Sequence, residues 1–298
     1  MDKLTVFTPT YNRQELLFRC YESLKRQTDK EFIWIIIDDG STDRTRDEVQ
    51  KWILNEVEFE IQYYYKQNGG LHTAYNLAIE KIQTELCVCI DSDDFMPDNA
   101  VELIRNYWDK YGTAEYAGIV GLDYDLDDHV IGDLLPNQKS VNLIDLLTNK
   151  YHINNGDRTN VVRTELYKQY APMKVFPGEK NFNPHYMHLQ ICQEKEFLVL
   201  NENLRYVEYQ AGGMSDMILK QYKNSPNSFA EIRKLYLSFP ETSWRFKIRH
   251  TIHYISSCMM AKKIFEPIKF CDWKLLTLLL YPIAGGLTLY IFAKTRKE

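Results

Sequence analysis

Short apolar runs alternate with segments of helical spacing through the first hundred residues, and this rhythm constrains the fold most. The apolar runs, rich in β-branched and aromatic residues, cover residues 4–8, 32–38, 61–65 and 86–90. The run FIWIIID at 32–38 is almost continuously apolar, as in a parallel strand that is buried on both faces. A β-α-β-α-β-α-β order predicts an α/β fold with a mostly parallel sheet and right-handed crossovers.

The segments between these runs have the apolar spacing of helices. Helical spacing begins near Leu16, resumes after Gly69-Gly70, and continues over 99–111. Ser41 and Thr42 are expected to cap the second helix, which carries Trp52 on its inner face.

The second half of the chain is less regular. GIVGLDYD at 118–125 and FLVLNENLRYVEY at 197–209 read as strands, and helices are expected near 166 and over 185–194. After about residue 225 the composition becomes helical and basic. We therefore expect a catalytic-type domain over 1–225 and a helical extension over 226–298.

Charge and cysteine content exclude some classes of function. The formal net charge of −5 argues against nucleic acid as the main partner, because binding to a phosphate backbone needs a basic surface. The six cysteines show no zinc-site spacing, so we expect reduced thiols in a cytoplasmic protein. The chain enters a strand directly after Met-Asp-Lys, with no visible signal peptide.

Polar residues follow all four predicted strands. Ligands of open α/β sheets bind beyond the carboxyl ends of the strands, so these residues are expected on one shared rim. They are Pro9, Thr10, Tyr11, Asn12 and Arg13; Asp38, Asp39, Gly40, Ser41 and Asp43; Lys66, Gln67, Asn68, Gly69 and Gly70; and Asp91, Ser92, Asp93 and Asp94.

The acidic cluster Asp91-Ser92-Asp93-Asp94 is the strongest of these signals. Three carboxylates in four residues repel one another unless a cation or a proton intervenes. Carboxylates suit hard ions such as Mg²⁺ and Mn²⁺, which also bridge to substrate phosphates. A solvated acidic turn is the alternative, and the pair Asp38-Asp39 at a neighbouring strand end makes it less attractive.

Four motifs in this order and spacing carry a resemblance to a known family. VFTPTYNR, IIIDDGSTD, NGGLHTAYN and CIDSDDFMPD resemble the inverting glycosyltransferases of family 2, including bacterial enzymes of capsular and exopolysaccharide synthesis. The resemblance is strong over about residues 3–110 and looser to about 215. It implies the GT-A fold, a Rossmann-like sheet flanked by helices.

The resemblance also implies roles for individual residues. Asp91 and Asp93, with Ser92 and Asp94 beside them, would hold Mn²⁺ or Mg²⁺ and the diphosphate of a nucleotide-diphospho-sugar. Asp38 and Asp39, next to Ser41, would recognise the base and ribose. Tyr11, between Pro9 and Arg13, would stack on the base. The remaining nucleotide-lining residues would be Asn68, Gly69 and Asn76.

The general base is where the chain departs from this family. Inverting transfer needs a group that accepts the proton of the acceptor hydroxyl. Related sequences place an acid about where His185 stands, and Glu179 lies six residues earlier. Both residues are candidates, and the carboxylate of Glu179 is preferred because it suits the mechanism of relatives.

Two further features concern the reaction. The Q-x-x-R-W motif of processive synthases is absent and QAGGMSD (210–216) takes a comparable place, so transfer of a single sugar is expected. The two aspartates and one aromatic ring suit a small pyrimidine, which favours UDP. A non-catalytic protein that binds nucleotide-sugars is the alternative, and a nucleotidyltransferase is disfavoured because its glycine-rich, basic first loop is missing.

The C-terminal segment 273–293 predicts contact with a membrane. Residues 275–293 carry no charge and approach the length of a membrane span. Basic residues flank both sides, which disfavours a simple span. Pro282, Gly285 and Gly286 are expected to break the helix, which would then lie in the interface or re-enter. We therefore expect a peripheral or monotopic enzyme on the inner face of the cell membrane, acting on a glycan or lipid-linked glycan acceptor; a buried hairpin or an oligomer contact is the alternative.

Overall fold

A computed structural model describes residues 4–209 and 217–296. The chain divides into two compact units. The first consists of Met1–Gly69, Thr73–Met173 and Met187–Tyr209, and the second of Gly70–His72, Lys174–Tyr186 and Gln210–Glu298.

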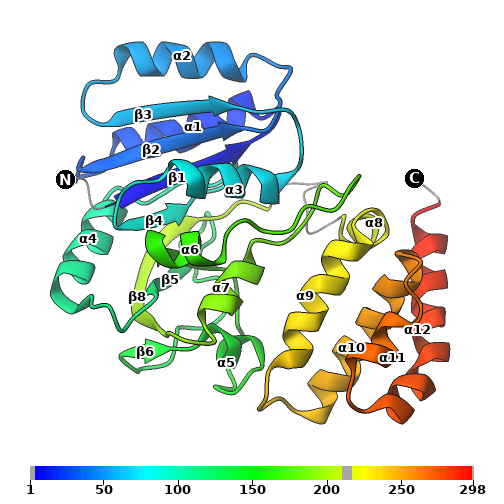
Figure 1. The fold of residues 1–298 in the computed structure, drawn as a ribbon. Coiled ribbons are helices and arrows are strands. Elements are labelled where there is room, and N and C mark those ends of the chain that lie inside the picture. The colour runs from blue at the N-terminus through cyan, green and yellow to red at the C-terminus, as the bar shows by residue number, and fades with distance from the viewer. Residues whose placement is uncertain (1–3, 210–216, 297–298) are drawn as a thin grey trace. The chain divides into compact units, whose positions relative to one another are not determined.

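The first unit is built on one mixed sheet (Figure 1). Its strands are β1 Leu4–Thr10, β2 Phe32–Asp38, β3 Glu60–Tyr65, β4 Leu86–Cys89, β5 Gly118–Tyr124, β6 Ser140–Val141, β7 Arg158–Arg163 and β8 Phe197–Tyr206. Their order in the sheet is β3-β2-β1-β4-β7-β5-β8-β6. Strands β1 to β4 pair in parallel, as do β5 and β8, whereas β7 runs antiparallel to both of its neighbours.

The four predicted strands are confirmed, each within two residues of its expected bounds. The residues Thr10, Asp38 and Tyr65 lie side by side at the ends of β1, β2 and β3. The polar residues that follow these strands therefore begin at one edge of the sheet, as the parallel arrangement predicts.

Helices cover both faces of this sheet (Figure 1). The helices before the C-terminal region are α1 Gln14–Lys25, α2 Thr45–Asn55, α3 Leu71–Lys81, α4 Ala100–Tyr111, α5 Leu143–Leu147, α6 Thr164–Tyr170 and α7 His185–Ile191. The apolar faces of α1, α2 and α4 form one core cluster with the sheet. On the opposite face, Tyr75 of α3 packs edge-on against Phe7 of β1 at a ring distance of 5.0 Å.

Stacked aromatic rings join α1 and α2 to the sheet. Tyr21 stacks on Trp52 at 4.4 Å and on Trp34 at 6.0 Å between ring centroids. The Trp34 indole N–H donates to Thr8 Oγ1 at 3.0 Å, so its buried polar atom is satisfied. The core that supports the sheet edge therefore depends on a few large rings.

The expected caps of α2 are wrong. The helix begins at Thr45, and Asp43 Oδ1 accepts from both the backbone N–H and the hydroxyl of that residue. Ser41 and Thr42 instead contact the loop after β1. The helix begins later than expected because Ser41 and Thr42 join two loops, a tertiary contact that local spacing does not show. The six cysteines are free thiols, as expected.

The C-terminal part of the second unit is a group of helices, coloured yellow to red in Figure 1. They are α8 Ile218–Asn224, α9 Pro226–Ser238, α10 Trp244–Met260, α11 Glu266–Phe270 and α12 Lys274–Lys294. Ile255 of α10 is buried against Leu280 and Ala284 of α12. Ser256 and Thr288 hydrogen-bond between the same two helices at 2.9 Å.

Helix α12 is continuous from Lys274 to Lys294, so the expected break at Pro282 is wrong. A proline inside a helix removes one N–H and bends the helix, and the remaining hydrogen bonds can carry it onward. By length and composition, α12 is able to cross a membrane, with a mean hydropathy of 1.9.

The aromatic stack gives a stability prediction. Trp52→Ala should lower the free energy of unfolding by about 3–5 kcal/mol, because it leaves a large cavity beside Tyr21 and Trp34. Urea denaturation measures this change. Leu54→Ala, on the same helix but 81% exposed, is the control and should change stability by less than about 0.5 kcal/mol. Equal effects of both changes would contradict the packing described here.

Candidate functional site

The loops that follow β1 and β2 are joined directly. The Asn12 backbone N–H donates to Ser41 Oγ at 2.9 Å, and Thr42 N–H donates to Asn12 Oδ1 at 2.7 Å. Asn12 adopts the left-handed backbone region, with φ of 51°, which asparagine tolerates better than most residues. These contacts fix the two loops against each other and leave Tyr11, which lies between β1 and Asn12, 47% exposed.

Asp38 and Asp39 are held by different sets of donors. Asp38 is fully buried and accepts from Ser41 N–H at 2.7 Å and from the Tyr63 hydroxyl at 2.6 Å. Asp39 accepts from Lys66 Nζ at 2.5 Å and from Gly69 N–H at 3.0 Å. Both carboxylates are thus fixed in place at the carboxyl end of β2.

Asn68 and Gly69 join this arrangement from the loop after β3. The side-chain amide of Asn68 donates to the backbone oxygen of Asp39 at 2.8 Å and to its carboxylate at 3.1 Å. The loops after β1, β2 and β3 therefore form one hydrogen-bonded rim, as the sequence predicts for residues at the ends of parallel strands.

The acidic cluster after β4 is paired with two arginines. Arg13 contacts Asp93 at 2.6 Å, from Nη1 to Oδ2. Arg205 of β8 contacts Asp94 at 3.3 Å and lies 3.7 Å from Asp91. The side chain of Asp91 remains 41% exposed and that of Asp93 19% exposed, so solvent reaches both.

Arg205 also binds a third carboxylate, that of Asp123 on β5. The side chain of Asp123 is fully buried and accepts from both the guanidinium and the Thr159 hydroxyl, the latter at 2.6 Å. Neither Arg205 nor Asp123 is among the residues singled out from the sequence. Their signal is a charged residue within a strand whose neighbours are apolar, because unpaired charges are rarely buried.

Burial raises the pKa of Asp94 to about 8, a value that includes the opposing effect of Arg205 and the added effect of the negative charges of Asp91 and Asp93. Asp94 is therefore largely protonated at pH 7 without a ligand, and the carboxyl groups of Asp91, Asp93, Asp94 and Asp123 outnumber the guanidinium groups of Arg13 and Arg205 by two. A bound divalent cation would favour the ionised form of Asp94 and neutralise the two negative charges that the arginines leave uncompensated.

Asp91 and Asp93 fit a cation that is completed by its substrate. Within residues 4–209 and 217–296, no three acidic, histidine or cysteine side chains converge into a ready metal site. Mg²⁺ typically binds one or two carboxylates and takes its other ligands from water and phosphate. Two partly exposed aspartates with hard oxygen ligands are consistent with that mode of binding.

The other predicted nucleotide-lining residues have different surroundings. Pro9 lies in β1 and Ser92 is buried beside the acidic cluster. Asn76 forms a reciprocal pair with the backbone of Met173, donating at 3.0 Å and accepting at 2.8 Å. Its amide therefore ties α3 to the chain after α6. The segment 210–216, which was compared with the Q-x-x-R-W motif, lies outside the described residues.

Glu179, in the second unit, holds the start of helix α9. Both of its carboxylate oxygens are occupied by donors from Asn227 and Ser228, at distances of 2.6 to 2.8 Å. The carboxylate is buried, and it satisfies backbone N–H groups that the first turn of a helix leaves without partners. This arrangement gives Glu179 a structural role and removes the basis for preferring it as the general base.

His185 is the first residue of α7, and its backbone N–H donates to Asn183 Oδ1 at 2.9 Å. Burial lowers the pKa of its imidazole to about 4. The ring is therefore neutral at pH 7 and able to accept a proton. Its basicity is close to that of an ordinary carboxylate.

Comparison with known proteins places the chain among glycosyltransferases. A sequence profile described as glycosyl transferase family 2 matches residues 5–170. The glycosyltransferase GlyA of Streptococcus pneumoniae is 30% identical over 139 residues, 44% of this chain and 19% of that protein. A Campylobacter jejuni GalNAc(5)-diNAcBac-PP-undecaprenol β-1,3-glucosyltransferase is 26% identical over 203 residues, 67% of this chain and 62% of its own length. The chain thus spans only part of these relatives.

Solved structures share the fold. Staphylococcus aureus TarS (residues 1–349), in complex with UDP-GlcNAc, superimposes with a TM-score of 0.62 at 18% identity, over 97% of this chain and 81% of that one. The mannosyltransferase PcManGT of Pyrobaculum calidifontis, in complex with GDP-Man and Mn²⁺, gives 0.58 at 14% identity, over 97% and 87%. The expected GT-A fold is confirmed. Because the family profile covers more than half of the chain, from β1 to the end of α6, the protein belongs to glycosyl transferase family 2.

Proposed function

We propose that the protein is a metal-dependent, inverting glycosyltransferase that moves one sugar from a nucleotide-diphospho-sugar, with UDP as the nucleotide, to a glycan or lipid-linked glycan. The observation that carries this proposal is the acidic cluster, whose carboxyl groups together with that of Asp123 outnumber their two arginine partners by two, at the end of a sheet in a family 2 chain. The complex of TarS with UDP-GlcNAc supports the choice of donor, and the complex of PcManGT with GDP-Man and Mn²⁺ supports the choice of metal.

The residues of the first unit would each bind one part of the donor. Asp39 would accept hydrogen bonds from the base and ribose, and the exposed ring of Tyr11 would stack on the base. The carboxylate of Asp38 is fully buried and already hydrogen-bonded, so it would hold the loop rather than contact the nucleotide as the sequence predicts. Asp91 and Asp93 would hold Mn²⁺ or Mg²⁺. The bound metal would neutralise the charge that develops on the departing diphosphate.

Inverting transfer has one further requirement, a base. The acceptor hydroxyl attacks the anomeric carbon, the bond to the diphosphate breaks, and the hydroxyl proton passes to the base. We assign this role to His185 in preference to Glu179, because the pKa of about 4 keeps the imidazole unprotonated at neutral pH. The carboxylate of Glu179 is already occupied by four hydrogen bonds.

Membrane association is the last part of the proposal. One side of α12 packs on α10, and the other side exposes large apolar residues along its length. They include Leu275, Leu278, Leu279, Ile283, Leu289 and Tyr290. A cytoplasmic enzyme attached to the inner face of the cell membrane by this helix would meet a lipid-linked acceptor there.

Asp93→Asn tests the metal site. We expect kcat/KM with a UDP-sugar to fall by about a hundredfold or more, the order found when one group that stabilises transition-state charge is removed. Calorimetric titration of UDP with and without Mn²⁺ should show that the metal-dependent part of binding is lost. Asp98→Asn is the control, because Asp98 is an exposed acid paired with Arg26. Undiminished metal-dependent binding by Asp93→Asn would refute the assignment.

His185→Ala and Glu179→Gln together test the general base. His185→Ala should lower kcat by at least about a hundredfold, with the KM for donor little changed. Glu179→Gln should lower the melting temperature and leave kcat per folded molecule within a few fold. If His185 is the base, kcat of the unmodified enzyme stays level as pH falls from 7 and declines only near pH 4, where the imidazole takes up a proton.

Two results would contradict the assignment to His185. One is a decline in kcat centred near pH 6.5, the ordinary value for histidine. The other is a small, equal loss from both variants, which would place the base elsewhere. Binding of UDP-sugars without transfer or hydrolysis by the unmodified protein would favour the non-catalytic alternative.

A further inference from the structure

The C-terminal helices carry a charge opposite to that of the whole chain. Residues 217–296 contain 13 Lys and Arg and 4 Asp and Glu, a net charge of +9, whereas the full chain has −5. Two of these positive charges, on Arg245 and Arg249, lie in one row on α10 that the neutral ring of His253 continues. Arg245, Arg249 and His253 are spaced four residues apart, so they share one face of the helix.

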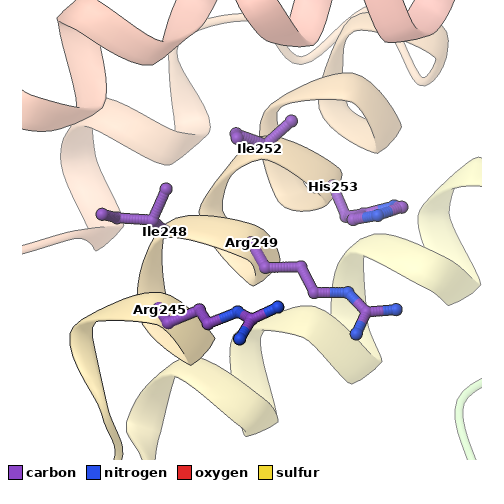
Figure 2. Close-up of a pocket in the computed structure, with 5 residues that line it drawn as sticks. All are labelled: Arg245, Ile248, Arg249, Ile252 and His253. Carbon is purple, nitrogen blue, oxygen red and sulfur yellow. The ribbon is translucent and has the colours of Figure 1, made fainter.

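This row lines a groove of about 550 Å³, together with Ile248 and Ile252 (Figure 2). Figure 2 shows the two guanidinium groups and the imidazole extending to the same side of α10, while the isoleucines extend away from them. The walls of the groove are thus mainly apolar and include the hydrocarbon parts of the arginine side chains, and the guanidinium groups lie at its edge.

The two arginines of the groove have no acidic partner among the residues that the structure describes. By contrast, Arg13 and Arg205 in the first unit contact carboxylates. Burial, together with the charges of Arg233 and Arg249, lowers the pKa of His253 to about 4, so the two guanidinium groups carry the charge of the row at pH 7. The positive charges of the two arginines are therefore not compensated by a carboxylate, as is typical of a site that binds an anion.

The apolar side of the groove continues into the contact between α10 and α12. Ile248 and Ile252 pack on the cluster formed by Ile255, Leu280 and Ala284. Trp244, which is 59% exposed, lies 5.8 Å from Trp273 between ring centroids, at the start of the two helices. Tryptophan is enriched at membrane–water interfaces, and the exposed face of α12 is apolar throughout.

We propose that this groove binds the phosphate headgroup of an anionic phospholipid in the membrane on which α12 lies. Arg245 and Arg249 would bind the phosphate oxygens, and the acyl chains would lie along α12. This inference rests on the membrane association proposed above. A lipid presents a phosphate next to acyl chains, and this combination matches two guanidinium groups beside the exposed apolar face of α12.

Vesicle flotation with the full-length protein tests the proposal. Vesicles of phosphatidylcholine alone are compared with vesicles of equal parts phosphatidylcholine and phosphatidylglycerol. We expect tighter partitioning onto the anionic vesicles. Replacing both arginines with glutamine should weaken it about thirtyfold, since each basic residue near an anionic surface contributes about 1 kcal/mol.

A variant that preserves charge distinguishes specific binding of a phosphate by the two arginines from general attraction to a basic surface. Arg245→Lys with Arg249→Lys keeps both charges and loses the planar fork that binds two phosphate oxygens at once, so partitioning should fall at least about fivefold. Lys262→Gln with Lys269→Gln, which removes two exposed charges of the same unit, is the control and should lose less than the arginine-to-glutamine pair. Melting temperatures confirm that all variants fold.

Each contrary result has a distinct meaning. Unchanged binding by the lysine variant, or equal losses from the two glutamine variants, overturns the groove as a specific site. Equal binding of the unmodified protein to both vesicle types overturns headgroup recognition and leaves the membrane association of α12 standing. If the unmodified protein floats with neither type of vesicle, both headgroup recognition and the membrane association of α12 are overturned. Release from the vesicles by glycerol phosphate at the same phosphate concentration overturns a lipid as the occupant.

Discussion

The buried ion network around Arg205 is the interaction on which the rest of the first unit depends. Its guanidinium, supplied by β8, binds Asp123 of β5 and contacts two aspartates that follow β4. Burying a charge without a partner is costly, and removing one member of a buried pair leaves the others uncompensated. The network therefore fixes where the acidic cluster stands relative to the second half of the sheet, before any ligand binds.

The sequence predicts the part of this unit that depends on local patterns. Strands β1 to β4 and the helices between them follow from apolar periodicity, and the acidic rim follows from the rule that parallel strands end at one edge. Arg205 and Asp123 are harder to predict, because their importance arises from the pairing of β5 with β8, two strands that are far apart in the sequence. Their contact joins residues 82 positions apart.

The difference between local pattern and tertiary contact also explains why the role of Glu179 could not be predicted from the sequence. In the sequence it is an acid in a loop, close to the position where relatives carry a catalytic carboxylate. In the structure it binds Asn227 and Ser228, which lie 48 and 49 residues later. Only the fold shows that these partners occupy the start of a helix, where a carboxylate stabilises unpaired N–H groups. Comparison of a short motif does not reveal a contact between residues so far apart in the sequence.

Helix α12 presents two different surfaces. Towards α10 it offers Ala284 and the hydroxyl of Thr288, and away from α10 it offers large apolar side chains. Removing it to obtain a more soluble protein would therefore have an unintended result. In the shortened chain, Ile255 and the apolar residues around it on α10 would be exposed to water. The exposed apolar face of α12 would thus be replaced by an exposed apolar face of α10. A more soluble protein for crystallisation would keep α12 and carry polar substitutions only on the face of this helix that points away from α10.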